Sequence, residues 1–356
     1  MTKPNVLISG ASVAGPALAY FLHQSGYDVT VVERAPALRD SGYAVDFRGT
    51  ALDVLEAMGI RNELCQHDTK MRGTIVVDEA GNEIAQLPVE AFGGELEVPK
   101  RDLTRILHRI TADDAQYLFD DSITALTEHA AGITVEFERH AAREFDLVFG
   151  ADGVHSNVRK LAFGPNGNAL RHLGMSGAGF STSNYLGLDG QGLLKPGKAA
   201  IYLFSASPAD RLTVSLSFAT DSPALDWRTR AEQEQALRAA FAGHEWEAPR
   251  LLKAMSEADD FYFASSSQVH LDHWHRGRVA LLGDAGYCAA PTSGMGTSQA
   301  LVGAWALARE LSAAGGHHEI AYTAYEQQLR PYVAENQAAG RRAAAGFGGE
   351  APRPAT

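Results

Sequence analysis

The hydrophobic positions at the start of the chain change their period twice, and each change predicts an element. Residues 5–10, NVLISG, form a short apolar run typical of a buried strand. The following PALAYFLHQSG has helical spacing and closes at Gly26, and DVTVVE returns to the pattern of a buried strand. This order predicts a βαβ unit, with which a dinucleotide-binding sheet commonly begins.

Later segments extend this α/β pattern. Residues 99–111 have helical spacing, and ITALTEHAAGITVEFER and REFDLVFGAD are typical of strands separated by turns. HRGRVALLGDA predicts another buried strand, and ALVGAWALARELSAA predicts the helix that follows it. We expect these elements to belong to the same sheet-and-helix unit as the N-terminus.

The middle of the chain has a different pattern. KAAIYLFSA and RLTVSLSFAT alternate apolar and polar residues, as antiparallel strands with one solvated face do. Large side chains in this region, Tyr185, Tyr202, Phe204 and Phe218, suit a core and a ligand pocket equally well. The sequence therefore predicts an α/β protein with a Rossmann-like domain and a second, mostly antiparallel domain.

Length and charge narrow the class of partner. The chain has 356 residues and a net charge of -12, which argues against nucleic acid and anionic membrane surfaces as partners. No apolar run approaches the roughly 20 residues of a membrane span, so we expect a cytoplasmic protein that binds small molecules. Cys65 and Cys288 lack redox or metal-ligand spacing, and we expect both to be buried.

Three histidines, His270, His273 and His275, invite a metal interpretation. Strand alternation would place His270 on the face opposite to the other two, and Asp272 is the sole carboxylate close in sequence. We therefore expect no metal site in this cluster.

The turn GASVAG follows the first strand and opens the first helix, which is the context that phosphate binding requires. Gly10 makes the tight turn, Gly15 lets the helix pack closely, and Ser12 replaces the usual middle glycine. Glu33 ends the second strand, where a carboxylate accepts ribose hydroxyls and repels a 2′-phosphate. This first nucleotide site should hold FAD or NAD rather than NADP, and the alternative is a tight turn without a ligand.

Two further motifs complete a set. GADGVHSNVRK at 150–160 and GDAGYCAAPTSGMG at 283–296 follow GASVAG in an order and spacing that resemble the para-hydroxybenzoate hydroxylase family of FAD-dependent monooxygenases. The resemblance implies that GASVAG binds the ADP half of FAD and that Asp284 binds the ribityl chain. It also implies that the backbone around Pro291, Gly294 and Gly296 approaches the flavin ring.

The same resemblance assigns roles to scattered residues. Asp152 would lie near the flavin pyrophosphate and the nicotinamide cofactor, and Arg101 would reach FAD from its helix. RDSGYAVDFRG is similar to a loop of tetracycline-inactivating members, which places Arg39 against NADPH and Asp46 against the flavin. Tyr287 and Met295 depart from the His and Gln that are frequent in the family. The expected cofactor-binding residues are Gly10, Ser12, Ala14, Gly15, Glu33, Arg34, Arg39, Asp46, Arg101, Asp152, Asp284, Pro291, Gly294, Met295 and Gly296.

The implied architecture is a Rossmann-like FAD-binding domain with a mostly antiparallel β-sheet substrate domain. We expect the FAD-binding domain in residues 1–71, 99–171 and 269–345, the substrate domain in 72–98 and 172–268, and a disordered tail in 346–356.

The implied activity is that of a monooxygenase active in antibiotic metabolism. NADPH or NADH would reduce FAD, and molecular oxygen would yield a flavin C4a-hydroperoxide that hydroxylates an aromatic or polyketide-like molecule. A FAD-dependent reductase or oxidase on the same fold, a halogenase, and a flavin carrier without turnover are the alternatives. We expect a monomer or weak dimer, and the sequence does not identify catalytic side chains.

Overall fold

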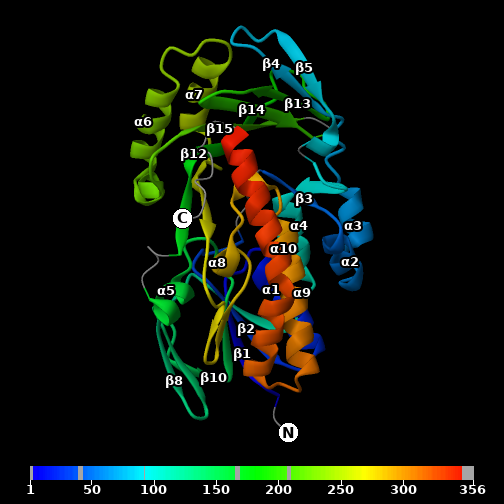
Figure 1. The fold of residues 1–356 in the computed structure, drawn as a ribbon, viewed down its shortest axis with the longest axis vertical. Helices are drawn as coiled ribbons and strands as arrows, with labels where there is room; N and C mark the ends of the chain where they lie inside the picture. The colour runs from blue at the N-terminus through cyan, green and yellow to red at the C-terminus, as the bar shows by residue number, and fades with distance from the viewer. Residues whose placement is uncertain (1–2, 39–42, 92, 165–168, 207–209, 347–356) are drawn as a thin grey trace.

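A six-stranded sheet is the centre of one half of the molecule (Figure 1), and its order confirms the predicted βαβ unit. The computed structural model describes residues 3–38, 43–91, 93–164, 169–206 and 210–346. The strands lie in the order β17 (His275–Arg276), β18 (Val279–Leu281), β11 (Leu147–Gly150), β1 (Asn5–Ser9), β2 (Asp28–Glu33) and β7 (Ala115–Phe119). All neighbours are parallel except β17 and β18.

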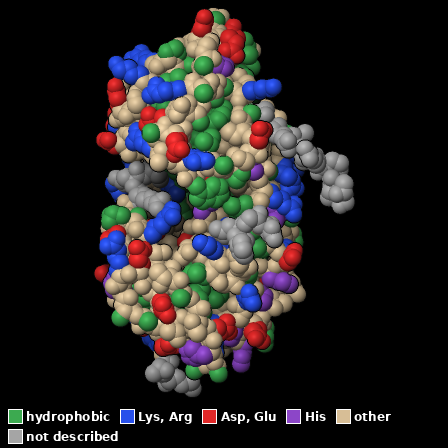
Figure 2. Space-filling model, turned by 90° about the vertical axis from the view of Figure 1, so that its left-hand side faces the viewer, with side chains coloured by type: hydrophobic (Ala, Val, Ile, Leu, Met, Phe, Trp, Pro, Cys, Tyr) green, Lys and Arg blue, Asp and Glu red, His purple; other side chains and the backbone are tan. Residues whose placement is uncertain are grey.

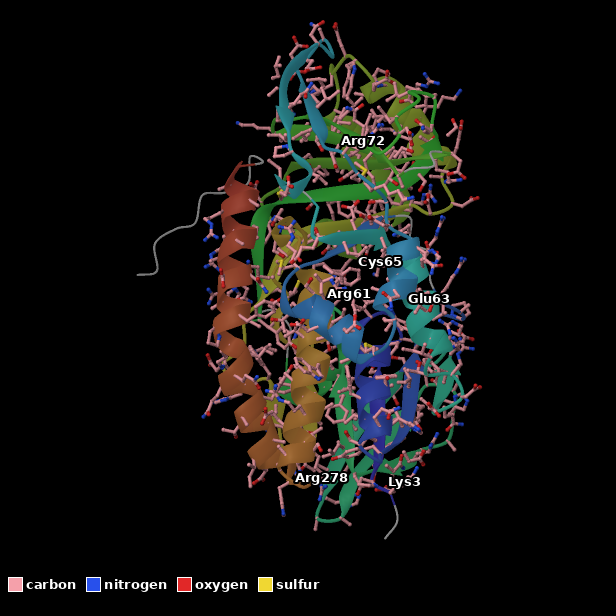
Figure 3. All side chains as sticks on the ribbon, turned by 90° about the vertical axis from the view of Figure 1, so that its right-hand side faces the viewer. Lys3, Arg61, Glu63, Cys65, Arg72 and Arg278 are labelled. Carbon is pink, nitrogen blue, oxygen red and sulfur yellow. The ribbon has the colours of Figure 1, made fainter. Side chains whose placement is uncertain are left out.

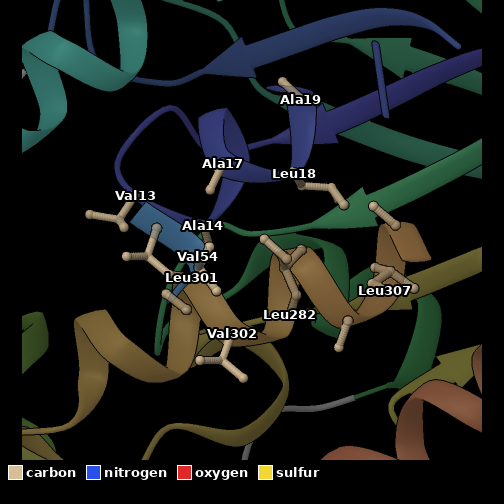
Figure 4. Packing of buried hydrophobic residues seen from close by; sticks show 14 of the residues in the cluster. Val13, Ala14, Ala17, Leu18, Ala19, Val54, Leu282, Leu301, Val302 and Leu307 are labelled. Atoms are coloured by element: carbon tan, nitrogen blue, oxygen red, sulfur yellow. The ribbon is translucent and has the colours of Figure 1, made fainter. Parts of the chain in front are cut away.

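The two faces of this sheet bury different cores, because successive side chains of a strand point to opposite sides. Val6 and Ile8 face helices, and Leu7 between them faces a small antiparallel sheet. The helical side contains α1 (Ala14–Gln24), α2 (Thr50–Ala57), α4 (Lys100–Arg109), α9 (Gly296–Ala313) and α10 (His318–Gly346). The other side contains β8 (Ile123–His129), β9 (Gly132–Phe137), β10 (Arg143–Phe145) and α5 (Asn157–Phe163). Figure 4 shows α1 and α9 packed through Leu18, Leu301 and their neighbours.

A seven-stranded sheet forms the other half and confirms the prediction of a mostly antiparallel unit. Its order is β16 (Tyr262–Val269), β12 (Leu170–Ser183), β15 (Arg211–Ala219), β14 (Ala199–Ser205), β13 (Gln191–Lys195), β4 (Thr74–Val77) and β5 (Glu83–Leu87). Only the β13–β4 pairing is parallel among its described neighbours. Helices α6 (Arg230–Ala240) and α7 (Ala248–Glu257) cover one face, burying Phe180, Leu203 and Leu216.

Short elements connect the two halves. The two-stranded sheet of β3 (Ala44–Phe47) and β6 (Leu96–Pro99) lies between them, and α10 runs from the lower half of Figure 1 up to β12. The remaining elements are α3 (Arg61–Gln66), α8 (Asp284–Tyr287), η1 (Val89–Ala91), η3 (Pro223–Trp227) and η4 (Pro291–Ser293).

The cysteine expectation was half wrong. Cys288 is buried, but Cys65 is exposed on α3, as Figure 3 shows. Leu64 packs into the core, and consecutive residues of a helix lie on different faces. Cys65, the next residue, therefore points away from the core. Both thiols are free.

The surface agrees with a protein that carries many charges of both signs. In the face drawn in Figure 2, Lys and Arg side chains are interspersed with Asp and Glu. Across the described residues, no helix is both long enough and apolar enough to span a bilayer.

A glycine in α9 offers a test of the packing between the helices. A methyl group at Gly303 would lie 2.1 Å from the Tyr287 hydroxyl oxygen, which in turn is 2.6 Å from the Tyr325 hydroxyl oxygen. Helix propensity favours alanine by about 1 kcal/mol, but overpacking a fully buried ring costs about 1–3 kcal/mol. We expect Gly303→Ala to lower the free energy of unfolding in urea titrations. In Gly346→Ala a methyl group meets no atom within 4 Å, so only helix propensity acts and the free energy of unfolding should not fall; equal values for the two variants would contradict this packing.

Candidate functional site

The turn after β1 is built for a close approach. Gly10 has φ +110°, and a Cβ there would lie 2.5 Å from the Ala151 carbonyl oxygen. A Cβ at Gly15 would lie 1.9 Å from the Gly10 carbonyl oxygen, so both positions require glycine. Ser12 is exposed beside Ala14, and no described side chain caps the start of α1. The free amides of this first turn suit a pyrophosphate.

Glu33 lies at the end of β2, against this turn. Its carboxylate accepts hydrogen bonds from the backbone amides of Ala11 and Ala35, each at 2.9 Å. Arg34 is exposed next to it, and Arg39 lies outside the described residues. The glutamate is therefore fixed at the position where the first turn would receive a nucleotide.

Asp152 follows β11 and packs beside Gly10, but its carboxylate serves α5. It accepts hydrogen bonds from the Ser156 hydroxyl at 2.5 Å and from the Asn157 and Val158 amides at 2.8 and 3.0 Å. Burial raises the pKa of Asp152. The structure thus gives this side chain a helix-capping role, and its contact with a cofactor remains a prediction.

Arg159 joins the second motif to the third. This buried side chain donates hydrogen bonds to the Ala285 carbonyl at 2.7 Å and the Val154 carbonyl at 2.6 Å. Arg159 belongs to the motif GADGVHSNVRK at 150–160, but the sequence indicated no role for it. The contact could not be predicted from the sequence, because the partner is a backbone carbonyl 126 residues away.

Asp284 begins α8 directly after β18. The residue is exposed to solvent, and desolvation of its carboxyl by the surrounding protein raises the pKa of that carboxyl. The ammonium of Lys100, at the start of α4, acts on this carboxyl electrostatically and opposes the rise in its pKa.

Lys100 was missed by sequence reasoning, which selected its neighbour. Its Nζ donates a hydrogen bond to the Tyr43 hydroxyl at 2.6 Å, and the Tyr43 ring is 5.2 Å from that of Tyr262. The Arg101 side chain instead is about half exposed, with Nε 3.9 Å from Asp102 Oδ1. The sequence showed two adjacent cations at the start of this helix, Lys100 and Arg101. It did not show that Lys100 is the one whose charge acts on Asp284.

The loop from Ala290 to Gly296 joins α8 to α9 and contains a strained residue. Ala290 has φ +73° and ψ 152°, a region that is nearly restricted to glycine and costs about 1–3 kcal/mol. Gly294 is left-handed with φ +65°, and both Pro291 and Gly294 are exposed. No described side chain caps α9 at Met295, and the Met295 amide itself donates to the Ser293 hydroxyl at 3.1 Å, so the backbone amides that suit a ligand are those from Gly296 onward.

The structure brings Asp46 from β3 to this loop. A Cβ at Gly294 would lie 3.8 Å from Asp46 Oδ2, and the Ser298 hydroxyl donates to the Asp46 carbonyl at 3.3 Å. Burial raises the Asp46 pKa, while Arg48, 3.3 Å from Oδ2, opposes the rise. Among the described residues Asp46 Oδ1 has no hydrogen-bond partner, and this buried oxygen can accept a hydrogen bond from a ligand.

A cavity of about 550 Å³ lies between the two halves. It combines aromatic and charged surface, and its lining includes Thr69, Arg101, Ser181, Phe204, Arg211 and Asp260. Of the aromatic candidates, Phe204 lines this cavity and stacks on Tyr202, with 5.5 Å between the ring centroids. Tyr185 donates to Glu247, and Phe218 belongs to the core beneath α6 and α7.

The histidine cluster has a different environment from the one expected. His273 Nδ1 and His275 Nε2 each lie 3.6 Å from the Glu326 carboxylate, which comes from α10. Within the part of the chain that the structure describes, no group of three or more His, Cys, Asp and Glu side chains could hold a metal ion.

Comparisons with known proteins agree on one family. A family model described as FAD binding domain matches residues 3–345. An uncharacterized protein of Mycobacterium tuberculosis (strain CDC 1551 / Oshkosh) is 44% identical over 339 residues, covering 93% of this chain and 91% of that protein. A flavin-dependent monooxygenase of an unknown prokaryotic organism is 39% identical over 340 residues, covering 94% and 88%. The crystal structure of tetracycline destructase Tet(55) superposes with a TM-score of 0.88 at 38% identity, covering 97% of this chain and 90% of that one.

A substitution at Asp284 tests the site, because it should weaken FAD binding but stabilise the apoprotein. Asp284→Asn should weaken FAD binding about tenfold, because it removes the charge from a hydrogen-bond acceptor. The same change should stabilise the apoprotein at neutral pH, since a raised carboxyl pKa in the folded state costs stability as the pH rises through that pKa. The stability difference should vanish below about pH 4, where the carboxyl is protonated in both states.

Flavin fluorescence titration and urea unfolding across pH measure the two effects, and exposed Asp28→Asn is the control. Unchanged FAD affinity in Asp284→Asn would assign this residue a structural role alone.

Proposed function

The chain belongs to the FAD-binding-domain family and is a FAD-dependent monooxygenase, and from this premise we propose which of its residues bind the cofactor and what it oxidises. The single observation that supports the assignment is the meeting of three distant turns, 10–15, 151–159 and 283–296, beside the carboxylate of Asp284. Within the described residues, a turn that admits only glycine, helix amides without a side-chain cap and a buried acceptor without a hydrogen-bond partner suit a dinucleotide.

The first turn would bind the ADP half of FAD. The α1 amides and the Ser12 hydroxyl would receive the pyrophosphate, and Glu33 would accept the ribose hydroxyls. Asp284 would accept a ribityl hydroxyl, because its partly desolvated carboxylate is exposed to a ligand. Each of these contacts uses a group whose position the backbone already fixes.

The loop before α9 would receive the flavin ring. The ring supplies the oxygen chemistry when bound, and the chain supplies orientation and the exclusion of water. Among the described residues no side chain caps α9, and the positive end of this 18-residue helix would stabilise the negative charge of a reduced ring bound there. Asp46 Oδ1 would accept a hydrogen bond there, which gives its unpaired oxygen a partner.

The reductant would be NADPH or NADH. This part of the proposal depends on the resemblance of the loop at 39–49, including Arg39, and of the turn around Asp152. Because both Asp152 oxygens already accept hydrogen bonds from α5, we expect the surrounding backbone rather than this carboxylate to meet the nicotinamide cofactor.

The substrate would be an aromatic or polyketide-like molecule. The cavity of about 550 Å³ has the size of a small-molecule site, and Phe204 offers it an aromatic surface. Arg101, Arg211 and Asp260 add charges that could orient polar substituents. Similarity to tetracycline destructase Tet(55) makes tetracyclines the first compounds to test.

We expect the purified protein to hold FAD non-covalently and to consume NADPH or NADH faster when its substrate is added. Under labelled dioxygen, one labelled atom should enter the organic product and the other should enter water. Stimulated consumption is followed by absorbance, and the label by mass spectrometry of tetracyclines and phenols as substrates. Hydrogen peroxide without labelled product from every compound would replace monooxygenation with the oxidase or reductase alternative.

A further inference from the structure

Residues 287–296, which we call the flavin loop, begin with three consecutive carbonyls that receive hydrogen bonds from buried amide side chains. Gln299 Nε2 donates to the Tyr287 carbonyl at 2.8 Å, and Gln337 Nε2 donates to the Cys288 carbonyl at 3.3 Å. Gln268 Nε2 donates to the Ala289 carbonyl at 3.1 Å. The three donors come from α9, α10 and β16, so three elements converge on the segment directly before Ala290.

The same amides make further hydrogen bonds. Gln337 Nε2 also donates to the Val269 carbonyl at 2.8 Å, and Gln268 Nε2 also donates to the Gln337 carbonyl at 2.7 Å. Asn336 Nδ2 donates to Gln299 Oε1 at 3.0 Å. A buried network with several bonds per amide is rigid, because each bond that breaks leaves a polar group without water.

Independent contacts fix the orientation of Gln268. Arg341 Nη1 donates to Gln268 Oε1 at 3.2 Å, and His270 Nε2 lies 3.0 Å from the same oxygen. Burial, together with the nearby charges of Arg171 and Arg341, lowers the His270 pKa to about 4, so its ring is neutral at pH 7 and donates through Nε2. With Oε1 thus occupied by donors, Nε2 of Gln268 must face the Ala289 carbonyl.

Helix α10 approaches the loop closely enough to make these bonds because of Gly340. A Cβ at Gly340 would lie 2.2 Å from the Ala289 carbonyl oxygen. The Thr292 hydroxyl donates to the Gly340 carbonyl at 2.8 Å, which ties the helix to the far side of Ala290 as well. Contacts therefore bracket the strained residue on both sides.

We infer that Gln268, Gln299 and Gln337 are positioning residues that hold Ala290 in its strained conformation and so present the loop to the flavin. An alanine stays in a region nearly restricted to glycine only when its surroundings determine the conformation. This inference rests on the proposed function, in which residues 290–296 receive the flavin ring. The amides act through the backbone and touch neither substrate nor cofactor.

A rescue experiment separates this role from general support of the core. Gln337→Met keeps the side-chain volume and removes two donors, so it should weaken FAD binding by the order of tenfold. Glycine adopts the Ala290 conformation without strain, so Ala290→Gly in the same chain should restore the FAD dissociation constant to within about threefold of wild type. Ala290→Gly alone should raise the melting temperature of the apoprotein.

The matched control is Gln233→Met on α6. Gln233 is buried like Gln337, at 8% and 7% exposure, and it donates from Nε2 to the Leu225 carbonyl at 2.9 Å, in the helical layer outside the flavin loop. This variant should lose stability without losing FAD affinity, and Ala290→Gly should not restore that stability beyond its own effect. Binding of ADP, which occupies the other half of the site, should be unchanged by Gln337→Met.

Flavin fluorescence titration of the apoproteins and their thermal unfolding provide the readouts. Unchanged FAD affinity in Gln337→Met, or failure of Ala290→Gly to restore it, would overturn the inference. Should Gln337→Met fail to fold, Gln299→Met replaces it in the same comparison, with the same two outcomes decisive. If the wild-type protein binds no FAD at all, the proposed function fails instead, so the two failures are distinct.

Discussion

The whole site depends on a backbone approach that leaves no room for a side chain. Gly10 passes the Ala151 carbonyl at a distance that a methyl group would reduce to 2.5 Å, and Gly15 passes Gly10 more closely still. These contacts bring the first turn against the second, and Arg159 then bonds the second turn to the third through the Ala285 carbonyl. A site assembled from three sequence-distant turns thus derives its geometry from two glycines and one buried guanidinium.

The periodicity of the sequence predicted the two sheets and the helices packed on them, because buried strands and amphipathic helices carry local patterns.

The site was harder to predict. Asp46 and the loop at Gly294 were each assigned to the flavin from resemblance, but their proximity is a tertiary fact. Lys100 and the glutamines around the loop belong to no motif, and the motif that contains Arg159 does not reveal its contact with Ala285, since the partners of these residues are backbone atoms or residues far along the chain. The prediction that Cys65 is buried was wrong, because a helix as short as α3 does not show from its sequence which face is buried. The division into domains and the cofactor roles of individual residues remain proposals.

The candidate site also shows how the protein tolerates groups that are energetically unfavourable in the folded state. Burial raises the pKa of Asp46, Asp152 and Asp284 alike, which means that each carboxylate is less stable here than in water. Asp152 is compensated by the amides of α5, whereas Asp46 and Asp284 have fewer described donors. Together with the strain at Ala290, these groups leave part of the fold's stability unrealised until a ligand completes their contacts.

The path of α10 has a consequence for biosynthesis. All three motifs leave the ribosome before residues 336–341, which provide Asn336, Gln337 and Gly340 to the loop. Domains made of one continuous segment can fold as they emerge, but this half of the molecule begins at β1 and is completed by the last long helix. A nascent chain that already contains all three motifs therefore still lacks the residues of α10 that fix the loop before α9. Cofactor loading belongs to the end of synthesis, and a chain interrupted within α10 would carry the motifs without being able to use them.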